Sequence, residues 1–242
     1  MTALKGTLTQ VLVDEFDFSG DTSDISVSVA MGEQDSTTLQ AAAMLSEPLL
    51  PAMTIEQNGY FKGTGAGELE KELWDRLGVA GVYVAALFGT HIAACPAYVK
   101  DDTFGQTMQI QTPAAALMTL NGAWAKGQGG SRGLRVYTGT LSAIGEQTAY
   151  DFGAAGSAGG EAYLFVQGIT GTATNAVILV ESSATEGGVY ATEATFTFSA
   201  LGAYKQSMSG TVNRWLRLNV SDLGGADDLT VVLIVCVAGV TE

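Results

Sequence analysis

The sequence has few of the residues on which enzymes usually depend. Its 242 residues include one histidine and two cysteines. Any Ser-His or Cys-His mechanism would have to use His91, and Cys95 would be the nearest thiol nucleophile. Four residues along an extended strand place those two side chains about 13 Å apart, too far for a nucleophile and its base. We therefore expect a non-enzymatic protein without catalytic residues, in which His91 is a partly buried packing residue.

Charged residues are scarce, and most of those present are acidic. Only 15% of the residues are charged, well below the roughly 25% of an average soluble domain. Acidic residues outnumber basic ones by 25 to 11, which gives a net charge of -14. Nucleic acids and anionic membranes attract clustered Lys and Arg, and here only Arg132 and Arg135 lie close together. We expect no stable binding to DNA, and the 47% hydrophobic composition suggests surface hidden in an assembly.

Long hydrophobic runs are absent as well. The longest apolar run, near residues 229–240, is shorter than the about 20 residues of a membrane-spanning helix. Residues 1–10 (MTALKGTLTQ) lack the apolar region of a signal peptide. Both cysteines lie in apolar stretches, IAACPAY and VLIVCVAG, where a thiol behaves as a small hydrophobic group. These features predict a soluble, cytosolic protein without a membrane partner or a disulfide framework.

Glycine, in contrast, is plentiful, and one cluster has the composition of a phosphate-binding loop. Residues 63–67 (GTGAG) lie between a predicted strand and a predicted helix, where backbone N–H groups attract anions. Three glutamates at the start of the helix would repel a phosphate, and no Lys-Ser/Thr or complete G-x-G-x-x-G follows. These glutamates are Glu68, Glu70 and Glu72. We interpret the cluster as a tight turn and expect no cofactor.

Aspartates near the N-terminus are the best candidates for metal ligands. Four of them recur close together without matching the calcium-loop pattern D-x-[DN]-x-[DN]-G: Asp14, Asp17, Asp21 and Asp24. We interpret them as solvated turn and edge carboxylates, with a loose cation site as the alternative, and expect no metal. Two further pairs are expected in turns before strands, because Asp hydrogen-bonds to its own backbone: Asp101-Asp102 and Asp227-Asp228.

Alternation of apolar and polar residues predicts strands along most of the chain. Residues 25–29 (ISVSV) alternate at period 2, the spacing of a strand with one buried face. A helix is predicted at residues 68–77, where leucines recur every fourth residue and Gly78 follows as a stop. The predicted strands are residues 9–18, 25–29, 54–62, 82–88, 98–111, 117–126, 134–141, 148–152, 161–169, 176–182, 192–199, 214–220 and 229–238. The last is apolar on both sides and is expected to be central.

These elements predict a mainly β fold with two domains. Residues 1–142 are expected to form a β-sandwich or barrel with one short helix. Residues 143–242, with strands separated by turns at short intervals, are expected to form a second β-sandwich of the jelly-roll or immunoglobulin-like type. The boundary is placed near residues 142–145.

Residues 31–53 interrupt the pattern with a long mixed segment (MGEQDSTTLQAAAMLSEPLLPAM) that has no clean period. Loops of this length are usually functional or disordered, and this one is too apolar for a disordered linker. We expect it to lie on a neighbouring subunit, with a loop folded over its own core as the alternative. The expected assembly residues are Met31, Leu39, Met44, Leu45, Leu49, Leu50 and Met53.

The three tryptophans could indicate a sugar-binding platform. Trp74, Trp124 and Trp215 are scattered over both halves of the sequence, so packing in a core or an interface is the better interpretation for each.

Two stretches together resemble a known family. The opening VLVDEFDFSGDTSDISVSV, followed by a long loop and then by MTIEQNGYFKGTGAGELEKELWDRLG, resembles the major tail tube proteins of long-tailed (siphovirus-type) bacteriophages. The resemblance covers residues 9–126 by the order of their elements. The second half, with YDFGAAGSAGGEAYLFVQGITG and SGTVNRWLRLNVSD, is similar to the C-terminal β domain of such proteins in phages of actinobacteria.

The resemblance implies a structural virion protein, assembled in the host cytoplasm, that forms hexameric rings stacked into a tail tube. Its partners would be copies of itself and other tail proteins such as the tape measure and the terminator, and DNA would pass through the lumen during ejection. Residues 31–53 and 1–10 would stack the rings. A lumen lined by carboxylates would repel phosphates and let DNA slide. The alternative is a capsid decoration, head-fibre or other virion β protein, and a carbohydrate-binding module is a more distant one.

Overall fold

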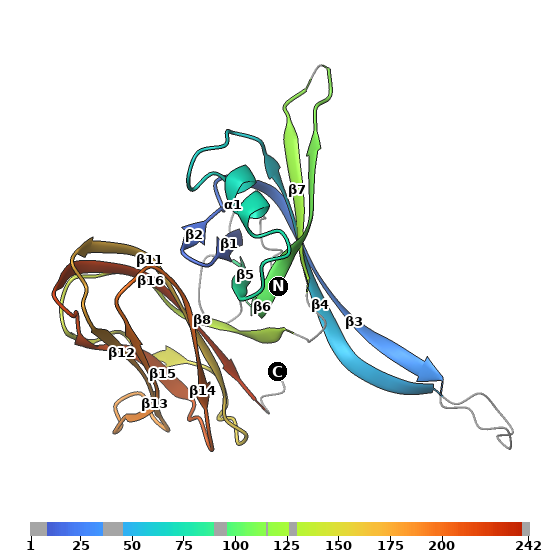
Figure 1. Ribbon diagram of the computed structural model, residues 1–242. Helices are drawn as coiled ribbons and strands as arrows, with labels where there is room; N and C mark the ends of the chain where they lie inside the picture. The colour runs from blue at the N-terminus through green and yellow to red at the C-terminus, as the bar shows by residue number, and fades with distance from the viewer. Residues whose placement is uncertain (1–8, 36–45, 90–95, 115, 126–129, 239–242) are drawn as a thin grey trace, which may run out of the picture. The chain divides into compact units, whose positions relative to one another are not determined.

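A computed structural model of the chain describes residues 9–35, 46–89, 96–114, 116–125 and 130–238 (Figure 1). These residues form antiparallel β-sheets and a single α-helix, so the predicted mainly β fold is confirmed. The chain divides into two compact units. Unit 1 consists of Met1–Ser19, Leu87–Tyr98 and Ser131–Glu242, and unit 2 of Gly20–Ala86 and Val99–Gly130. The two compact units do not coincide with the predicted domains, residues 1–142 and 143–242. That division stays a prediction about which parts of the chain fold independently.

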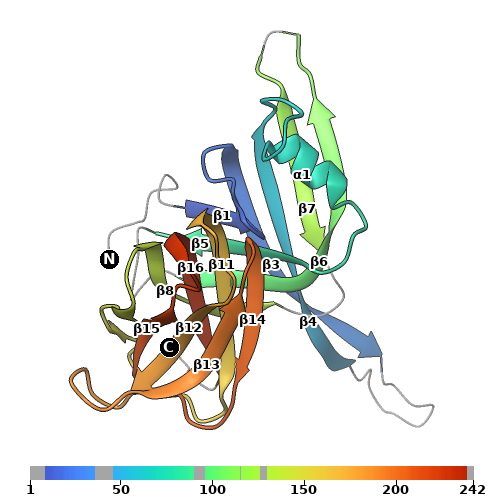
Figure 2. The ribbon, with the colours of Figure 1, turned by 60° about the vertical axis from the view of Figure 1, so that its left-hand side comes forward.

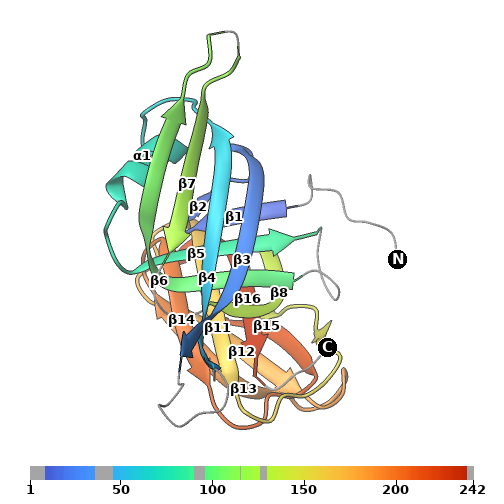
Figure 3. The same ribbon diagram turned by 90° about the vertical axis from the view of Figure 1, so that its right-hand side faces the viewer.

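Unit 2 is built on a sheet in which β3, β4, β7 and β6 lie side by side in that order (Figure 3). The bounds are Thr22–Asp35 for β3, Ser46–Tyr60 for β4, Pro96–Gln111 for β6 and Thr119–Ala125 for β7. β6 begins in unit 1, and β5 (Val82–Phe88) begins in unit 2 and ends in unit 1. Apolar side chains that are fully buried, among them Ile55, Leu120 and Trp124, form the core of the sheet.

The helix α1 (Leu69–Asp75) packs on this sheet through its leucines. Leu69 and Leu73 are buried, and a Cβ added to Gly122 of β7 would lie 2.8 Å from a methyl of Leu73, so this glycine makes room for the helix. The helix is shorter than predicted because Arg76, at φ -100° and ψ 2°, already leaves helical geometry. Gly78 follows at φ 71°, the left-handed conformation expected of a helix stop.

Unit 1 contains two sheets that face each other across one core. The first sheet has the order β14-β11-β16-β8 and continues through β6 and β5 to β1 and β2. The second has the order β10-β15-β12-β13, with β9 also paired to β15. Figure 2 shows β15, β12 and β13 of this sheet. The bounds are Thr9–Val13 (β1), Phe16–Asp17 (β2), Ser131–Leu141 (β8), Gly145–Glu146 (β9), Tyr150–Asp151 (β10), Gly160–Gly171 (β11), Ala176–Ser183 (β12), Ala191–Phe198 (β13), Gly202–Met208 (β14), Trp215–Asp222 (β15) and Ala226–Val237 (β16).

The core of unit 1 follows from alternation along these strands. Leu164 and Val166 of β11 pack in the same buried cluster as Ile178 and Val180 of β12, at the two-residue spacing of one sheet face. β16 is buried on both sides and lies between β11 and β8, so the prediction of a central strand is confirmed. Its thiol, Cys236, is 6% exposed.

Three local predictions were wrong. Residues 9–18 are a tight hairpin rather than one strand, because Asp14 has a positive φ of 48° and Val13 pairs with Phe16. β14 was not predicted, since AYKQSM lacks apolar alternation. The aspartate pairs lie inside strands rather than in turns: Asp101-Asp102 in β6, where Asp102 has φ 45°, and Asp227-Asp228 in β16.

An ion pair joins β10 to Arg214, the residue before β15. The guanidinium of Arg214 donates two hydrogen bonds of 2.6 Å to the carboxylate of Asp151, which also accepts one from the backbone N–H of Gly153. Arg214 and then the Gly153 N–H lower the pKa of Asp151 from 3.8 to about 2. Because the folded-state pKa is depressed, the pair stabilises the fold above about pH 4, and this contribution is lost as the pH falls towards 2.

Asp151→Asn is therefore expected to lower stability slightly at pH 7 and by clearly less near pH 2, where about half of the folded molecules carry a protonated Asp151. The loss at pH 7 should stay below about 1 kcal/mol, because the pair is partly exposed to solvent. Thermal unfolding of both proteins at the two pH values measures this, and a difference that persists unchanged at pH 2 would contradict the assignment.

Candidate assembly interface

A long two-stranded ribbon leaves the sheet of unit 2 (Figure 1). β4 pairs with β7 only from Thr54 to Tyr60, whereas it pairs with β3 along nearly its whole length, as far as Ser46 opposite Asp35. Residues 29–35 and 46–53 therefore form a β-ribbon without a third strand among the described residues, which we call the arm. A two-stranded ribbon is at best marginally stable in water on its own. The arm is thus the part of unit 2 that would gain most from contact with another surface.

The arm corrects the prediction of a long loop. Most of residues 31–53 is extended and paired: Met31 lies opposite Pro51, and Glu33 lies opposite Pro48 after a register shift. The sequence concealed this because proline is depleted in strands. Leu49 and Leu50 belong to β4, whereas Leu39, Met44 and Leu45 lie outside the described residues.

The root of the arm is fixed by a row of buried groups. Met53, one of the predicted assembly residues, is 3% exposed and therefore lies in the core and not on a surface. The ammonium of Lys100, fully buried, donates a hydrogen bond to the carbonyl of Met53. The amide of Gln57, also fully buried, donates to the hydroxyl of Thr22 at 2.6 Å and accepts from the indole N–H of Trp124 at 3.5 Å. These buried bonds join β3, β4, β6 and β7 and hold the register from which the arm extends.

On β3, opposite the root and just beyond it, apolar side chains of the arm face solvent. Val29 is 56% exposed and Met31 is 61% exposed. They stand two residues apart on β3, so they share one face of the strand. Pro48 and Pro51 have no backbone N–H, which makes the β4 edge of the arm a poor partner for a further strand. The arm is therefore suited to contact another surface through its apolar face or through the edge of β3.

A second group of exposed apolar residues lies at the other end of the same sheet. We call it the far-end patch, and it consists of Tyr60, Ile110, Leu117 and Met118, which are 42%, 39%, 71% and 38% exposed. Tyr60 ends β4, whose other end runs into the arm. The backbone N–H of Phe61 donates to the carbonyl of Met118 and joins the two parts of the patch. Unit 2 thus carries exposed apolar groups at both ends of one strand.

The tryptophans, which the sequence treated alike, occupy different environments. Trp124 is fully buried, Trp74 on α1 is 64% exposed, and Trp215 is intermediate. The predicted packing role is confirmed for Trp124. Trp74 is exposed in the single chain, so of the two predicted packing roles only an interface with another subunit fits it.

The glycine cluster is a turn, as predicted. The carboxylate of Glu72 accepts the backbone N–H of Gly67 at 3.1 Å and forms an ion pair with Arg76. A glutamate thus occupies the position at which an anion would bind the turn.

Among the residues that the structure describes, the remaining candidate catalytic and metal-binding side chains do not form a cluster. Asp17 accepts hydrogen bonds from the side chain of Gln10 and from the backbone of Ser19, and Asp21 forms an ion pair with Lys62, so both make turn and surface contacts. Within the described ranges, no three His, Cys, Asp or Glu side chains gather in a way that could hold a metal ion. His91 and Cys95 lie outside these ranges. In the part of the chain that the structure covers, no helix is long and apolar enough to span a membrane.

Comparison with solved structures finds similarity to phage tail and virion proteins. No protein-family model and no curated protein matches it. The tail tube of phage SPP1 is 10% identical with a TM-score of 0.38, over 51% of this chain and 75% of that chain. A chain from the virion of a native gene transfer agent is 12% identical with a TM-score of 0.38, over 54% of this chain and 98% of the other.

A third structure matches over a longer stretch. The SPP1 Dit protein, described as a paradigm of the hub adsorption apparatus in phages that infect Gram-positive bacteria, is 11% identical with a TM-score of 0.34. The match covers 94% of this chain and 98% of that chain. TM-scores below 0.5 do not establish a common fold.

Proposed function

We propose that this chain is a non-enzymatic structural subunit that assembles with copies of itself into the stacked, hexameric rings of a phage tail tube. The observation that carries the proposal is the arm, a paired β-ribbon that runs past the sheet of its own unit and exposes Val29 and Met31. A monomer gains nothing from such an element. An assembly in which the arm is covered by the next subunit does.

The position of the two apolar surfaces favours an open-ended assembly. The arm and the far-end patch lie at opposite ends of β4. Contact between the arm of one subunit and the far-end patch of the next would be heterologous, and heterologous contacts that do not close continue into a filament or a stack. A two-fold dimer would instead use the same surface on both partners. This geometry supports stacking along an axis.

The energetic gain per contact is moderate, as a reversible assembly requires. Covering the exposed parts of two side chains of this size contributes about 2 kcal/mol, which corresponds to an affinity gain of about 30-fold. Several such contacts around a ring act together, so avidity stabilises the stack far beyond a single contact.

The acidic composition fits the passage of DNA. A net charge of -14 with few basic residues gives a surface that repels phosphate over distances of about 10 Å at moderate ionic strength. In a tube, carboxylates that face the lumen would let DNA slide without stable binding. Tape measure and terminator proteins would be the further partners of such a tube in the virion tail.

Negative-stain electron microscopy of the purified chain, with light scattering over a concentration series, tests the proposal. Rods or stacked rings whose length grows with protein concentration are expected. Discrete trimers would favour a capsid decoration protein, and monomers at all concentrations would refute self-assembly. For the lumen, cryo-electron microscopy of the rods is expected to show an acidic inner surface, and a neutral or basic one would overturn the charge argument.

A further inference from the structure

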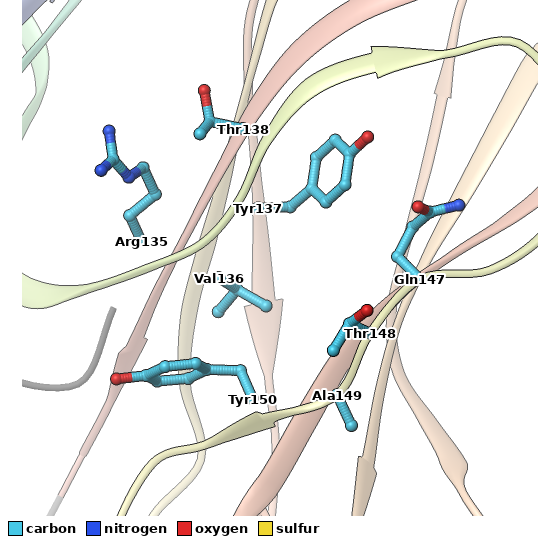
Figure 4. A pocket seen from close by; sticks show the side chains of 8 residues that line it. All are labelled: Arg135, Val136, Tyr137, Thr138, Gln147, Thr148, Ala149 and Tyr150. Atoms are coloured by element: carbon cyan, nitrogen blue, oxygen red, sulfur yellow. The ribbon is translucent and has the colours of Figure 1, made fainter. Parts of the chain in front are cut away.

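A pocket of about 350 Å³ opens on unit 1, and the tube function does not use it. It lies between β8 and the segment that joins β9 to β10 (Figure 4). The lining residues come from two short stretches of chain: Arg135, Val136, Tyr137 and Thr138 on one side, and Gln147, Thr148, Ala149 and Tyr150 on the other. Its volume falls in the range of about 300–1,000 Å³ that is typical of small-molecule sites.

Both walls of the pocket are held in place by the fold. Tyr137 pairs with Leu233 in the ladder between β8 and β16. On the other wall, the backbone N–H of Gln147 donates to the carbonyl of Leu218 at 2.8 Å, and Tyr150 pairs with Leu216 of β15. The pocket is therefore formed before any ligand arrives, which lowers the entropic cost of binding.

The lining combines an apolar floor with neutral polar groups at the rim. Tyr150 is 7% exposed, and Val136 and Ala149 are half-buried beside it. Thr148 is exposed, and Figure 4 shows Tyr137 and Gln147 on opposite walls. Hydroxyl and amide groups both donate and accept hydrogen bonds. The rim therefore suits a ligand whose own groups do both.

Tyr137 has the placement of a stacking platform. Its ring is partly exposed, and its hydroxyl donates to the carbonyl of Thr140 at 3.3 Å, which restrains the ring. Burial raises the pKa of this hydroxyl above 10.0, so the side chain stays neutral at physiological pH. A restrained ring offers apolar surface at low entropic cost.

The charge of the pocket narrows the class of ligand. No carboxylate lines it, although the chain has 25 acidic residues. The one charged lining residue, Arg135, directs its guanidinium to the side chain of Gln10 at 2.9 Å and to the carbonyl of Gly89 at 3.5 Å. Neutral groups thus dominate, and a ligand that has many hydroxyls and an apolar ring face fits them better than an anion or a purely apolar molecule.

We propose that this pocket binds a neutral saccharide unit, with one sugar face on the Tyr137 ring and the sugar hydroxyls hydrogen-bonded to Gln147 and Thr148. The C–H groups of a sugar face pack on aromatic rings, and the hydroxyls at its edge pair with the rim. A nucleoside is the other class of ligand that stacks on tyrosine, and the test includes it.

Saturation-transfer NMR with the full-length chain tests the site, because it reports ligand binding whether or not the protein assembles. The probes are glucose, galactose, N-acetylglucosamine, rhamnose and maltose, with adenosine and thymidine for comparison, each at about 10 mM so that millimolar affinity is detected. At least one saccharide is expected to receive saturation at its ring protons. Tyr137→Ala is expected to weaken its binding by about tenfold or more, and Thr148→Val by a few fold.

Tyr190→Ala is the matched control, because it removes another partly exposed tyrosine ring of unit 1 outside the pocket, and it should bind the saccharide like the wild type. Absence of saturation for every saccharide overturns the proposal, as does binding of the nucleosides alone. The proposal is also overturned if both single variants, Thr148→Val and Tyr137→Ala, bind the saccharide as tightly as the wild type. These outcomes leave the tube function untouched, since microscopy tests that separately.

Discussion

The double variant Val29→Lys, Met31→Lys is expected to remain dispersed under conditions in which the wild-type chain forms rods or stacked rings. Both side chains are more than half exposed in the single chain, so the fold should lose no more than about 1 kcal/mol of stability for the two substitutions together. Docking of the arm, in contrast, would lose about 2 kcal/mol of apolar burial per contact and would have to desolvate two added ammonium groups. Light scattering measures the assembly, and thermal unfolding checks the fold.

The control for this variant is the double variant Val189→Lys, Leu201→Lys, which places the same charge on two exposed side chains of unit 1, 95% and 47% exposed. It is expected to assemble like the wild type. Assembly of the double variant at wild-type concentrations would show that the arm is not the docking element. Loss of assembly in both proteins would assign the effect to added charge and not to the arm.

Sequence patterns located most strands because each strand buries apolar side chains on at least one face. Residues 82–88 were predicted as a strand and form β5 with the same bounds, since their apolar residues are consecutive and no proline or polar cluster interrupts them. The arm was missed for the opposite reason. Its pairing joins Asp35 to Ser46 and Met31 to Pro51, and the two prolines and the mixed composition of residues 46–53 hide the extended conformation. Cross-strand partners, and not local propensity, decide such a segment.

Burial of individual side chains also lay beyond the sequence. Met53 has the same apolar character as Met31, yet one is in the core and the other is exposed, because Met53 packs against Gly130 whereas Met31 lies farther out on the arm. The pocket could not be predicted either. Tyr137 and Gln147 are ten positions apart and face each other only because β8 and the segment before β10 belong to opposing sheets.

Trp124→Ala is expected to cost about 3–5 kcal/mol of unfolding free energy, the largest effect of a single substitution in unit 2. The side chain is fully buried in β7, where its residue pairs with Ile55 of β4 on one side and with Gly105 of β6 on the other. Its removal leaves a cavity and takes the indole N–H away from the buried amide of Gln57. For a chain of this length the melting temperature should fall by roughly 6–20 °C.

Trp74→Ala provides the matched control, because it makes the same substitution at a tryptophan that is 64% exposed on α1. It is expected to change the melting temperature little, and to lower the tendency to assemble if α1 takes part in an interface. Acrylamide should quench the fluorescence of Trp74 and spare Trp124, which checks the difference in burial without any substitution. Equal destabilisation by the two variants would mean that α1 buries Trp74 within the single chain. If only Trp124→Ala is destabilising, the core of unit 2 depends on the buried side chain that β7 contributes near the root of the arm.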